Sequence, residues 1–178
     1  MRAKVQALKL AKDVTSFPLP HPMNDELREL YQSVILDHSR KPRNFGELHG
    51  DGCVHVHGDN PSCGDEIDVF IKLNDGKVED IKFNGSGCAI SQASASMMTL
   101  KIKGKPSEQA AKMATVFRGV VTGQDRQLAE EEALGELQLL EGVQHFPQRV
   151  KCAMLAWRAL EQALEKGQGD VTTEDKPD

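Results

Sequence analysis

The sequence is poor in aromatic residues. Its 178 residues include one Trp, one Tyr and six Phe, which together make 4 % of the chain. Proteins that bind single-stranded nucleic acid commonly stack the bases on aromatic side chains, and so few rings argue against a platform of that kind. The hydrophobic core must therefore rest on Leu, Ile, Val, Ala and Met, within a hydrophobic content of 39 %.

The sequence also lacks an excess of positive charge. Its 22 basic and 27 acidic residues give a formal net charge of −5, whereas binding nucleic acid through phosphate neutralisation needs a basic field. We therefore expect no nucleic-acid partner. A local exception is formed by Lys101, Lys103 and Lys105. We interpret these either as cations at the negative end of a helix or as a docking patch for an acidic protein.

Long hydrophobic runs are missing as well. No stretch approaches the roughly 20 apolar residues that a membrane-spanning helix requires, and Lys9 and Lys12 interrupt any apolar segment near the N-terminus. We therefore expect a cytoplasmic protein with no membrane partner. In that reducing compartment cysteines are expected to bind metal or react as thiols rather than form a disulfide framework. The sequence has four of them: Cys53, Cys63, Cys88 and Cys152.

The length suits one domain of ordinary size. Residues 1–22 end in a segment with Pro18, Pro20 and Pro22, which disfavours regular helix, and we expect a flexible N-terminal extension that the fold does not need. The domain itself is predicted over residues 23–166. Residues 167–178 are polar and lack apolar anchors, so they are predicted to be a disordered tail.

Hydrophobic periodicity predicts an α+β fold. Residues 24–41 are predicted to form a helix whose apolar face consists of Leu27, Leu30, Tyr31, Val34 and Ile35. Three antiparallel strands are predicted from alternating segments that start near residues 53, 66 and 78, the last two joined by the turn NDGK. Helical patterns dominate after residue 88, and Pro147 is predicted to open the last helix. The expected architecture is a three-stranded antiparallel sheet with helices packed on one face.

A thiol and a carboxylate share one predicted turn. Cys63 and Asp65 belong to the segment NPSCGD, residues 60–65, which precedes the second predicted strand. Gly64 lets the backbone turn tightly, so that Asp65 can point to the same side as the thiol. The sequence therefore predicts an exposed turn that carries both groups.

Two further cysteines lie where positive potential favours a thiolate. Cys88 follows two glycines at the N-terminus of a predicted helix, whose N–H groups favour an anion. Cys152 lies near the start of the last predicted helix, after Arg149 and Lys151. A free thiol has a pKa near 8.5, so settings that lower its pKa serve metal binding and nucleophilic chemistry alike.

Three thiolates and a carboxylate can form a four-coordinate site of the kind that zinc accepts, and thiolates also hold iron–sulfur clusters. Each cysteine alone is equally well explained as a small buried hydrophobe. We interpret Cys53, in an alternating strand, as structural. His55 and His57 share one strand face near the turn, either as alternative ligands or as surface residues, and we leave all six histidines unassigned.

Similarity to one protein family is carried by three segments: ELYQSVILDHSRKPRNFGEL, NPSCGDEIDVFIKLNDGKVEDIKFNGSGCAISQASASMMT and FPQRVKCAMLAWRAL. They resemble the U-type iron–sulfur cluster assembly proteins, the IscU and NifU N-terminal domain family, from about Leu27 to Leu164. Two departures from IscU resemble the SufU branch. Lys151 stands where IscU proteins have a histidine, and Cys88 and Cys152 lie 64 positions apart, farther than in IscU.

The resemblance implies a SufE/NifU-like fold that binds one zinc ion through Cys63, Asp65, Cys88 and Cys152. It also implies that Cys63 accepts persulfide sulfur from a SufS-type cysteine desulfurase and passes it to a downstream Suf scaffold or an apo-protein. Arg149 and Lys151 are expected to support the site, or else to be ordinary solvated cations.

Other functions fit the same residues. The chain is either a zinc-dependent sulfurtransferase or a non-enzymatic scaffold on which a transient 2Fe–2S cluster is assembled and then transferred to apo-proteins. Lys151 favours the sulfurtransferase. A third possibility is a regulator that stimulates the desulfurase without carrying sulfur.

Overall fold

The structure, a computed structural model, describes residues 25–124 and 134–174. It starts with helix α2 (Asp25–Arg40), close to the predicted range 24–41, and this helix has acidic residues in its first turn and basic residues in its last. Tyr31 and Ile35 are fully buried, but Leu30 is 53 % exposed, so the apolar face is narrower than predicted. The expected extension over residues 1–22 and the domain boundary at Met23 lie outside the described residues.

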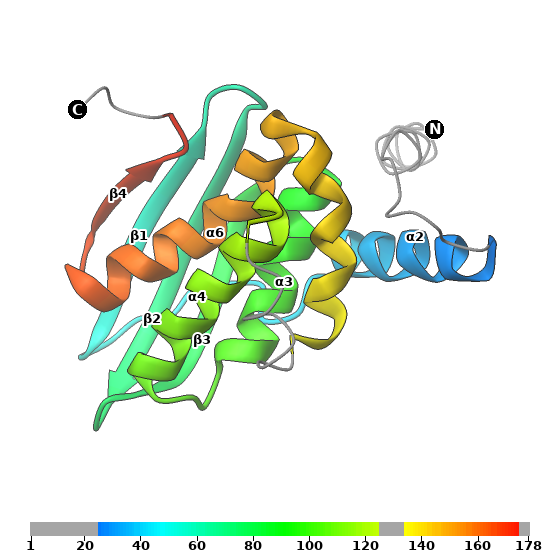
Figure 1. Cartoon of the computed structure of the whole chain (residues 1–178). Coiled ribbons are helices and arrows are strands. Elements are labelled where there is room, and N and C mark those ends of the chain that lie inside the picture. The colour runs from blue at the N-terminus through cyan, green and yellow to red at the C-terminus, as the bar shows by residue number, and fades with distance from the viewer. Residues whose placement is uncertain (1–24, 125–133, 175–178) are drawn as a thin grey trace, which may run out of the picture.

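Four strands form the sheet, in the order β3-β2-β1-β4. β1 (Cys53–Asn60), β2 (Asp65–Asn74) and β3 (Lys77–Ser86) are antiparallel neighbours, as predicted. Asp75 and Gly76, between β2 and β3, have φ angles of 49° and 72°, and such positive values at both positions are what the favoured two-residue hairpin turn requires. β4 (Gly169–Thr172) runs parallel to β1 at the sheet edge (Figure 1).

This fourth strand corrects two predictions. The sheet is four-stranded and mixed rather than three-stranded and antiparallel, and residues 169–172 of the predicted disordered tail are ordered as a strand. The segment is short and has one apolar residue, Val171, so it lacks the alternation that marks a strand in sequence. It is held by backbone pairing to β1 and by contact of Val171 with the core.

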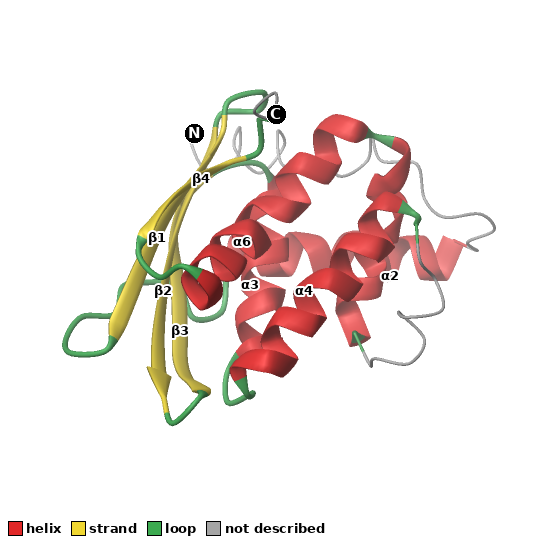
Figure 2. Ribbon diagram, turned by 60° about the vertical axis from the view of Figure 1, so that its left-hand side comes forward, coloured by secondary structure: helices red, strands yellow, loops and turns green. Residues whose placement is uncertain are grey.

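Helices cover one face of the sheet and leave the other open (Figure 2). α3 (Ala89–Ile102) and α6 (Pro147–Glu165) lie against the strands, while α4 (Ser107–Thr122) and the 3-10 helix η1 (Gly135–His145) pack on each other and on α6. Pro147 occupies the first turn of α6, as predicted. Among the described residues no helix is long and apolar enough to cross a membrane.

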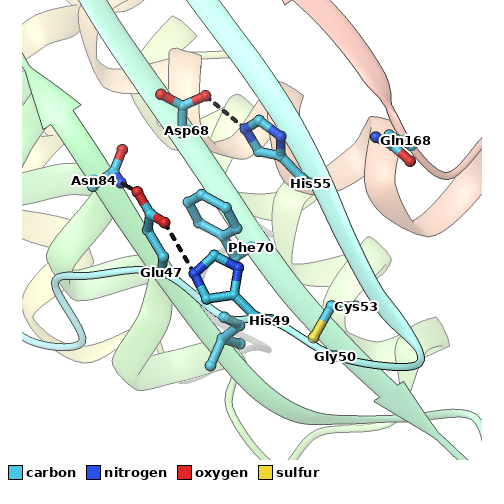
Figure 3. A pocket seen from close by; sticks show the side chains of 10 residues that line it. Glu47, His49, Gly50, Cys53, His55, Asp68, Phe70, Asn84 and Gln168 are labelled. Atoms are coloured by element: carbon cyan, nitrogen blue, oxygen red, sulfur yellow. Dashed lines mark hydrogen bonds and ion pairs between the residues drawn. The ribbon is translucent and has the colours of Figure 1, made fainter.

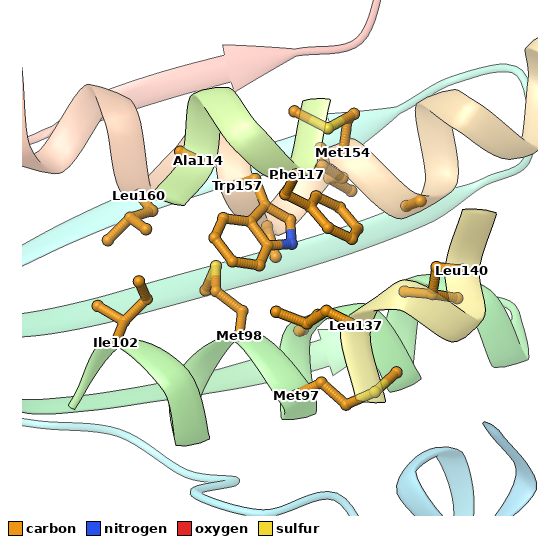
Figure 4. Packing of buried hydrophobic residues seen from close by; sticks show 14 of the residues in the cluster. Met97, Met98, Ile102, Ala114, Phe117, Leu137, Leu140, Met154, Trp157 and Leu160 are labelled. Atoms are coloured by element: carbon orange, nitrogen blue, oxygen red, sulfur yellow. The ribbon is translucent and has the colours of Figure 1, made fainter. Parts of the chain in front are cut away.

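Aromatic and aliphatic side chains fill the space between α3, α4 and α6 (Figure 4). The Trp157 ring stacks on Phe117 with centroids 4.6 Å apart, and its indole N–H donates a 3.1 Å hydrogen bond to Ser94 Oγ. Ser94 in turn donates to the carbonyl of Ala153 at 2.7 Å. These buried bonds tie α3 to α6, and each of these helices contributes a cysteine near its N-terminus.

Strand periodicity assigns polar residues to two opposite faces. Successive side chains in a strand point to opposite sides, so Asn60 and Asp65, which are paired across β1 and β2, face the helices and are buried. His57 and Asp68 form another pair of the same ladder and face the open side. The sheet therefore separates the cysteine-containing site from a histidine-containing surface.

Candidate metal centre

Cys63, Asp65 and Cys152 converge between the turn that follows β1 and the start of α6. One ligand atom from each, the two Sγ atoms and a carboxylate oxygen, lies within 4.8 Å of the others. Asp65 and Cys152 are fully buried, whereas Cys63 is exposed. The group has the donor atoms that zinc accepts, and Cys63 is the donor that faces solvent.

The turn that carries Cys63 is closed by main-chain hydrogen bonds. The N–H groups of Cys63 and Gly64 donate to the carbonyl of Asn60 at 3.3 and 2.9 Å. Gly64 has a φ angle of 71°, in the left-handed region where glycine carries no penalty. The predicted tight turn is confirmed for Cys63, which is exposed, and the two groups do lie on the same side. Asp65, however, is the first residue of β2 and is fully buried rather than on an exposed turn.

Both carboxylate oxygens of Asp65 have fixed partners. The N–H of Cys88 donates to Oδ1 at 2.8 Å, and the amide of Asn60 donates to Oδ2 at 2.9 Å. A Cβ at Gly87 would lie 2.6 Å from Oδ1 and 2.4 Å from Ser91 Oγ, closer than real contacts allow. Gly87 is therefore needed for the end of β3 to pass beside Asp65.

Cys88 is the N-cap residue of α3, and its Sγ accepts a 3.4 Å hydrogen bond from the N–H of Ser91. A hydrogen bond from the Cys152 thiol holds the pKa of Cys88 below its ordinary value, with help from Ser91 and the charge of Arg149. The same hydrogen bond and burial raise the pKa of Cys152. Cys88 is therefore the more acidic thiol of this pair.

Cys88 lies beside the metal-binding group rather than within it. Its Sγ contacts Cys152 and its N–H contacts Asp65, but it is not among the residues whose ligand atoms all lie within 4.8 Å of one another in the described part of the chain. Cys88 is therefore the neighbouring thiol that could supply a fourth donor to this group.

Asn60 is a site residue that the sequence analysis missed. Its side chain is fully buried, and its amide donates to Cys152 Sγ at 3.3 Å as well as to Asp65. Its oxygen accepts a 2.8 Å hydrogen bond from Thr173, which follows β4. Asn60 is the first residue of the NPSCGD segment. Its hydrogen bonds to Asp65, Cys152 and Thr173 become apparent only in the folded structure.

The two cations expected to support the site have different surroundings. Arg149 is half-buried, and its charge contributes to the lowered pKa of Cys88. Lys151 Nζ lies 3.5 Å from Glu174 Oε1, which also accepts a 2.8 Å hydrogen bond from Ser62 in the Cys63 turn. Lys151 thus contacts the C-terminal segment that borders the turn.

The remaining candidates lie outside the site. Cys53 is half-buried at the start of β1. His55 and His57 point to the open face of the sheet, where both contact Asp68. These histidines are therefore not alternative ligands of the Cys63 site.

Replacing Asn60 with alanine is expected to weaken Zn²⁺ binding by about 10- to 100-fold, the usual effect of removing a group that orients metal ligands. The change removes the amide group that donates to Asp65 Oδ2 and the amide oxygen that accepts a hydrogen bond from Thr173. Competition with a chromophoric chelator measures the affinity. Asn84→Ala is the matched control, because the side-chain amide of Asn84 donates to the exposed Glu47 rather than to a proposed ligand. Wild-type affinity in Asn60→Ala would contradict an orienting role.

Comparison with known proteins places the chain among iron–sulfur assembly proteins. An iron–sulfur cluster assembly scaffold protein IscU from Streptococcus pyogenes is 46 % identical over 79 % of this chain and 86 % of that protein. The zinc-dependent sulfurtransferase SufU of Bacillus subtilis is 45 % identical over 82 % of this chain and 97 % of that protein.

Solved structures agree with this placement. A candidate cluster assembly scaffold protein for the SUF system from Fervidobacterium islandicum has a TM-score of 0.67 and 34 % identity, over 74 % of this chain and 94 % of that one. The NifU-like N-terminal protein from Brucella abortus has a TM-score of 0.61 and 25 % identity, over 76 % and 92 % of the two chains.

A family model, the NifU-like N terminal domain, matches residues 30–153. This span contains all the cysteines of the chain and the whole described sheet except β4. The resemblance inferred from the sequence is therefore confirmed, and the chain belongs to the NifU-like N-terminal domain family of iron–sulfur cluster assembly proteins.

Proposed function

We propose that this protein is a zinc-dependent sulfur acceptor in iron–sulfur cluster assembly, with zinc held by Cys63, Asp65, Cys88 and Cys152. The observation that carries the proposal is the difference in exposure within the donor set, where Cys63 is exposed while Asp65 and Cys152 are fully buried. When bound, zinc keeps its thiol ligands deprotonated without changing their oxidation state.

The exposed ligand is also the one with the fewest side-chain contacts to hold it. Asp65 and Cys152 are tied to Asn60, and Cys88 is fixed as the N-cap of α3, whereas the Cys63 turn is closed by main-chain bonds at a glycine. Cys63 is therefore the ligand most able to leave the metal and meet a second protein.

Sulfur transfer to Cys63 is a thiol exchange. The Cys63 thiolate attacks the outer sulfur of a persulfide on a cysteine desulfurase, a new S–S bond forms on Cys63, and the desulfurase cysteine leaves as a thiolate. Exchange of this type needs a thiolate, the form in which a metal-bound Cys63 would be kept, and access, which the exposed position of Cys63 provides. Delivery to a downstream scaffold or apo-protein repeats the exchange with Cys63 as the donor.

The partners and the compartment follow from this proposal. A SufS-type cysteine desulfurase supplies the sulfur, and a Suf scaffold or an apo-protein receives it, in the cytoplasm. The similarity to a zinc-dependent sulfurtransferase over nearly its full length supports this assignment. Lys151 contacts Glu174. Its side chain is basic and adds no further ligand for a cluster.

A second function uses the same residues. The relatives named as scaffold proteins support assembly of a transient 2Fe–2S cluster on Cys63, Asp65, Cys88 and Cys152, since thiolates suit iron–sulfur clusters. A scaffold holds iron and sulfide together, whereas an acceptor carries sulfur on one thiol.

Trapping the carried sulfur tests the proposal. The zinc-loaded protein is incubated with desulfurase and cysteine, alkylated and digested, and the cysteine peptides are weighed. We expect one added sulfur on the Cys63 peptide and none on the Cys53 peptide, the internal control. Sulfur absent from Cys63 while the desulfurase still turns over would indicate a regulator that carries none.

A further inference from the structure

The open face of the sheet carries a second cluster of metal-binding side chains. His55 and His57 are two residues apart on β1, so they share a face, and Asp68 on β2 is the direct cross-strand partner of His57. Figure 3 shows His55 and Asp68 on this face, beside Phe70. The cluster lies across the sheet from the Cys63 site.

Both imidazoles converge on one carboxylate oxygen. His55 Nε2 lies 2.7 Å and His57 Nδ1 lies 3.0 Å from Asp68 Oδ1. On its other side His57 is the register partner of Asp170 in β4. The hydrogen bond to Asp68 raises the pKa of His57, and the charge of Asp170 acts in the same direction. Asp68 therefore contacts both rings, and Asp170 is the neighbour of His57 on the other strand.

Ring stacking fixes the orientation of His55, and the cluster is open to solvent. The His55 ring stacks on Phe70 with centroids 4.6 Å apart and planes at 7°. The side chains of His55, His57 and Asp68 are 43 %, 38 % and 25 % exposed. His55 and Asp68 line an open pocket of about 500 Å³, so an ion can reach them without displacing core residues.

We propose that His55, His57 and Asp68, with Asp170, bind a divalent transition-metal ion at a second site. Imidazole and carboxylate donors together suit Zn²⁺, Co²⁺, Ni²⁺ and Fe²⁺. Two histidines two residues apart on a strand, with a carboxylate across the ladder, place such donors on one side of an ion.

Binding at this site requires a local rearrangement. The Cys63 group is the one among the described residues whose ligand atoms all lie within 4.8 Å of one another, so the histidine donors are less tightly assembled. Each ring turns from the carboxylate oxygen toward the ion, and a neutral imidazole moves its proton to the other ring nitrogen to offer a lone pair. The exposure of both rings permits this movement.

One experiment can distinguish the two sites, because the second site has no sulfur donors. Metal-free, reduced protein is titrated anaerobically with Co²⁺ and followed by absorption and by equilibrium dialysis. We expect two equivalents to bind, one with the intense thiolate-to-metal absorption of the Cys63 site and one without it. His57→Ala and Asp68→Asn should each lose the equivalent without thiolate absorption and keep the other.

Matched variants make the outcome decisive. His145→Ala removes an exposed histidine from η1 and should keep both equivalents, and His57→Gln, which retains a hydrogen-bonding side chain, should still lose the second. A wild-type protein that binds one equivalent, or a His57→Ala variant that binds two, would overturn the second site. Loss of the thiolate absorption in the wild type would instead count against the Cys63 site.

Discussion

Replacing Cys63 with serine is expected to reduce persulfide transfer by at least about 100-fold, to the rate of the desulfurase alone. A serine hydroxyl supplies almost no anion at neutral pH, and the thiolate is the nucleophile in sulfur exchange. Cys63 is also the exposed cysteine of the four, so no other thiol takes its place on a docked partner. The assay follows sulfide or alanine formation by the desulfurase with and without this protein.

Cys53→Ser is the control for this experiment. Cys53 is half-buried at the start of β1, away from the group formed by Cys63, Asp65 and Cys152. Its variant should stimulate the desulfurase as the wild type does. Full stimulation by Cys63→Ser would refute the acceptor role and leave a purely regulatory one.

Removing zinc is expected to lower the thermal midpoint by roughly 10 °C while the far-ultraviolet circular dichroism stays close to that of the loaded protein. Free zinc at about 1,000 times its Kd stabilises the folded state by about 4 kcal/mol, and each kcal/mol corresponds to about 2–4 °C for a chain of this size. The four proposed ligands come from the turn after β1, from β2 and from the starts of α3 and α6, so the metal joins elements that are distant in sequence.

The secondary structure should persist without the metal because the core is independent of it. Trp157, Phe117 and Met98 are fully buried and are not among the proposed ligands, and the sheet ladder needs no metal. Reloading with zinc should restore the midpoint. A midpoint that does not change on chelation would mean that the site does not join these elements.

Local sequence signals predicted much of this molecule. The hairpin at Asp75 and Gly76 and the helix start at Pro147 were both predicted from backbone preferences that act over a few residues. The Cys63 and Asp65 turn was predicted for the same reason, because Gly64 dictates its geometry. Such features depend on neighbours in sequence, which a single sequence displays.

Features that depend on distant partners were missed. β4 is defined by pairing with β1 rather than by its own residues, and the role of Asn60 depends on Thr173, 113 positions away. The surroundings of Lys151 likewise depend on Glu174. Residues 169–174, which belong to the predicted disordered tail, are therefore part of the site's supporting structure. Hydrophobic periodicity cannot predict such contacts between distant segments.

Native mass spectrometry under anaerobic conditions tests the central claim most directly. The protein is incubated with desulfurase, cysteine, Zn²⁺ and ferrous iron, and the His57→Ala variant is used so that metal at the open face does not enter the count. We expect one retained zinc and extra sulfur that maps to Cys63. Two irons and two sulfides in place of zinc would contradict the acceptor function and establish a cluster scaffold.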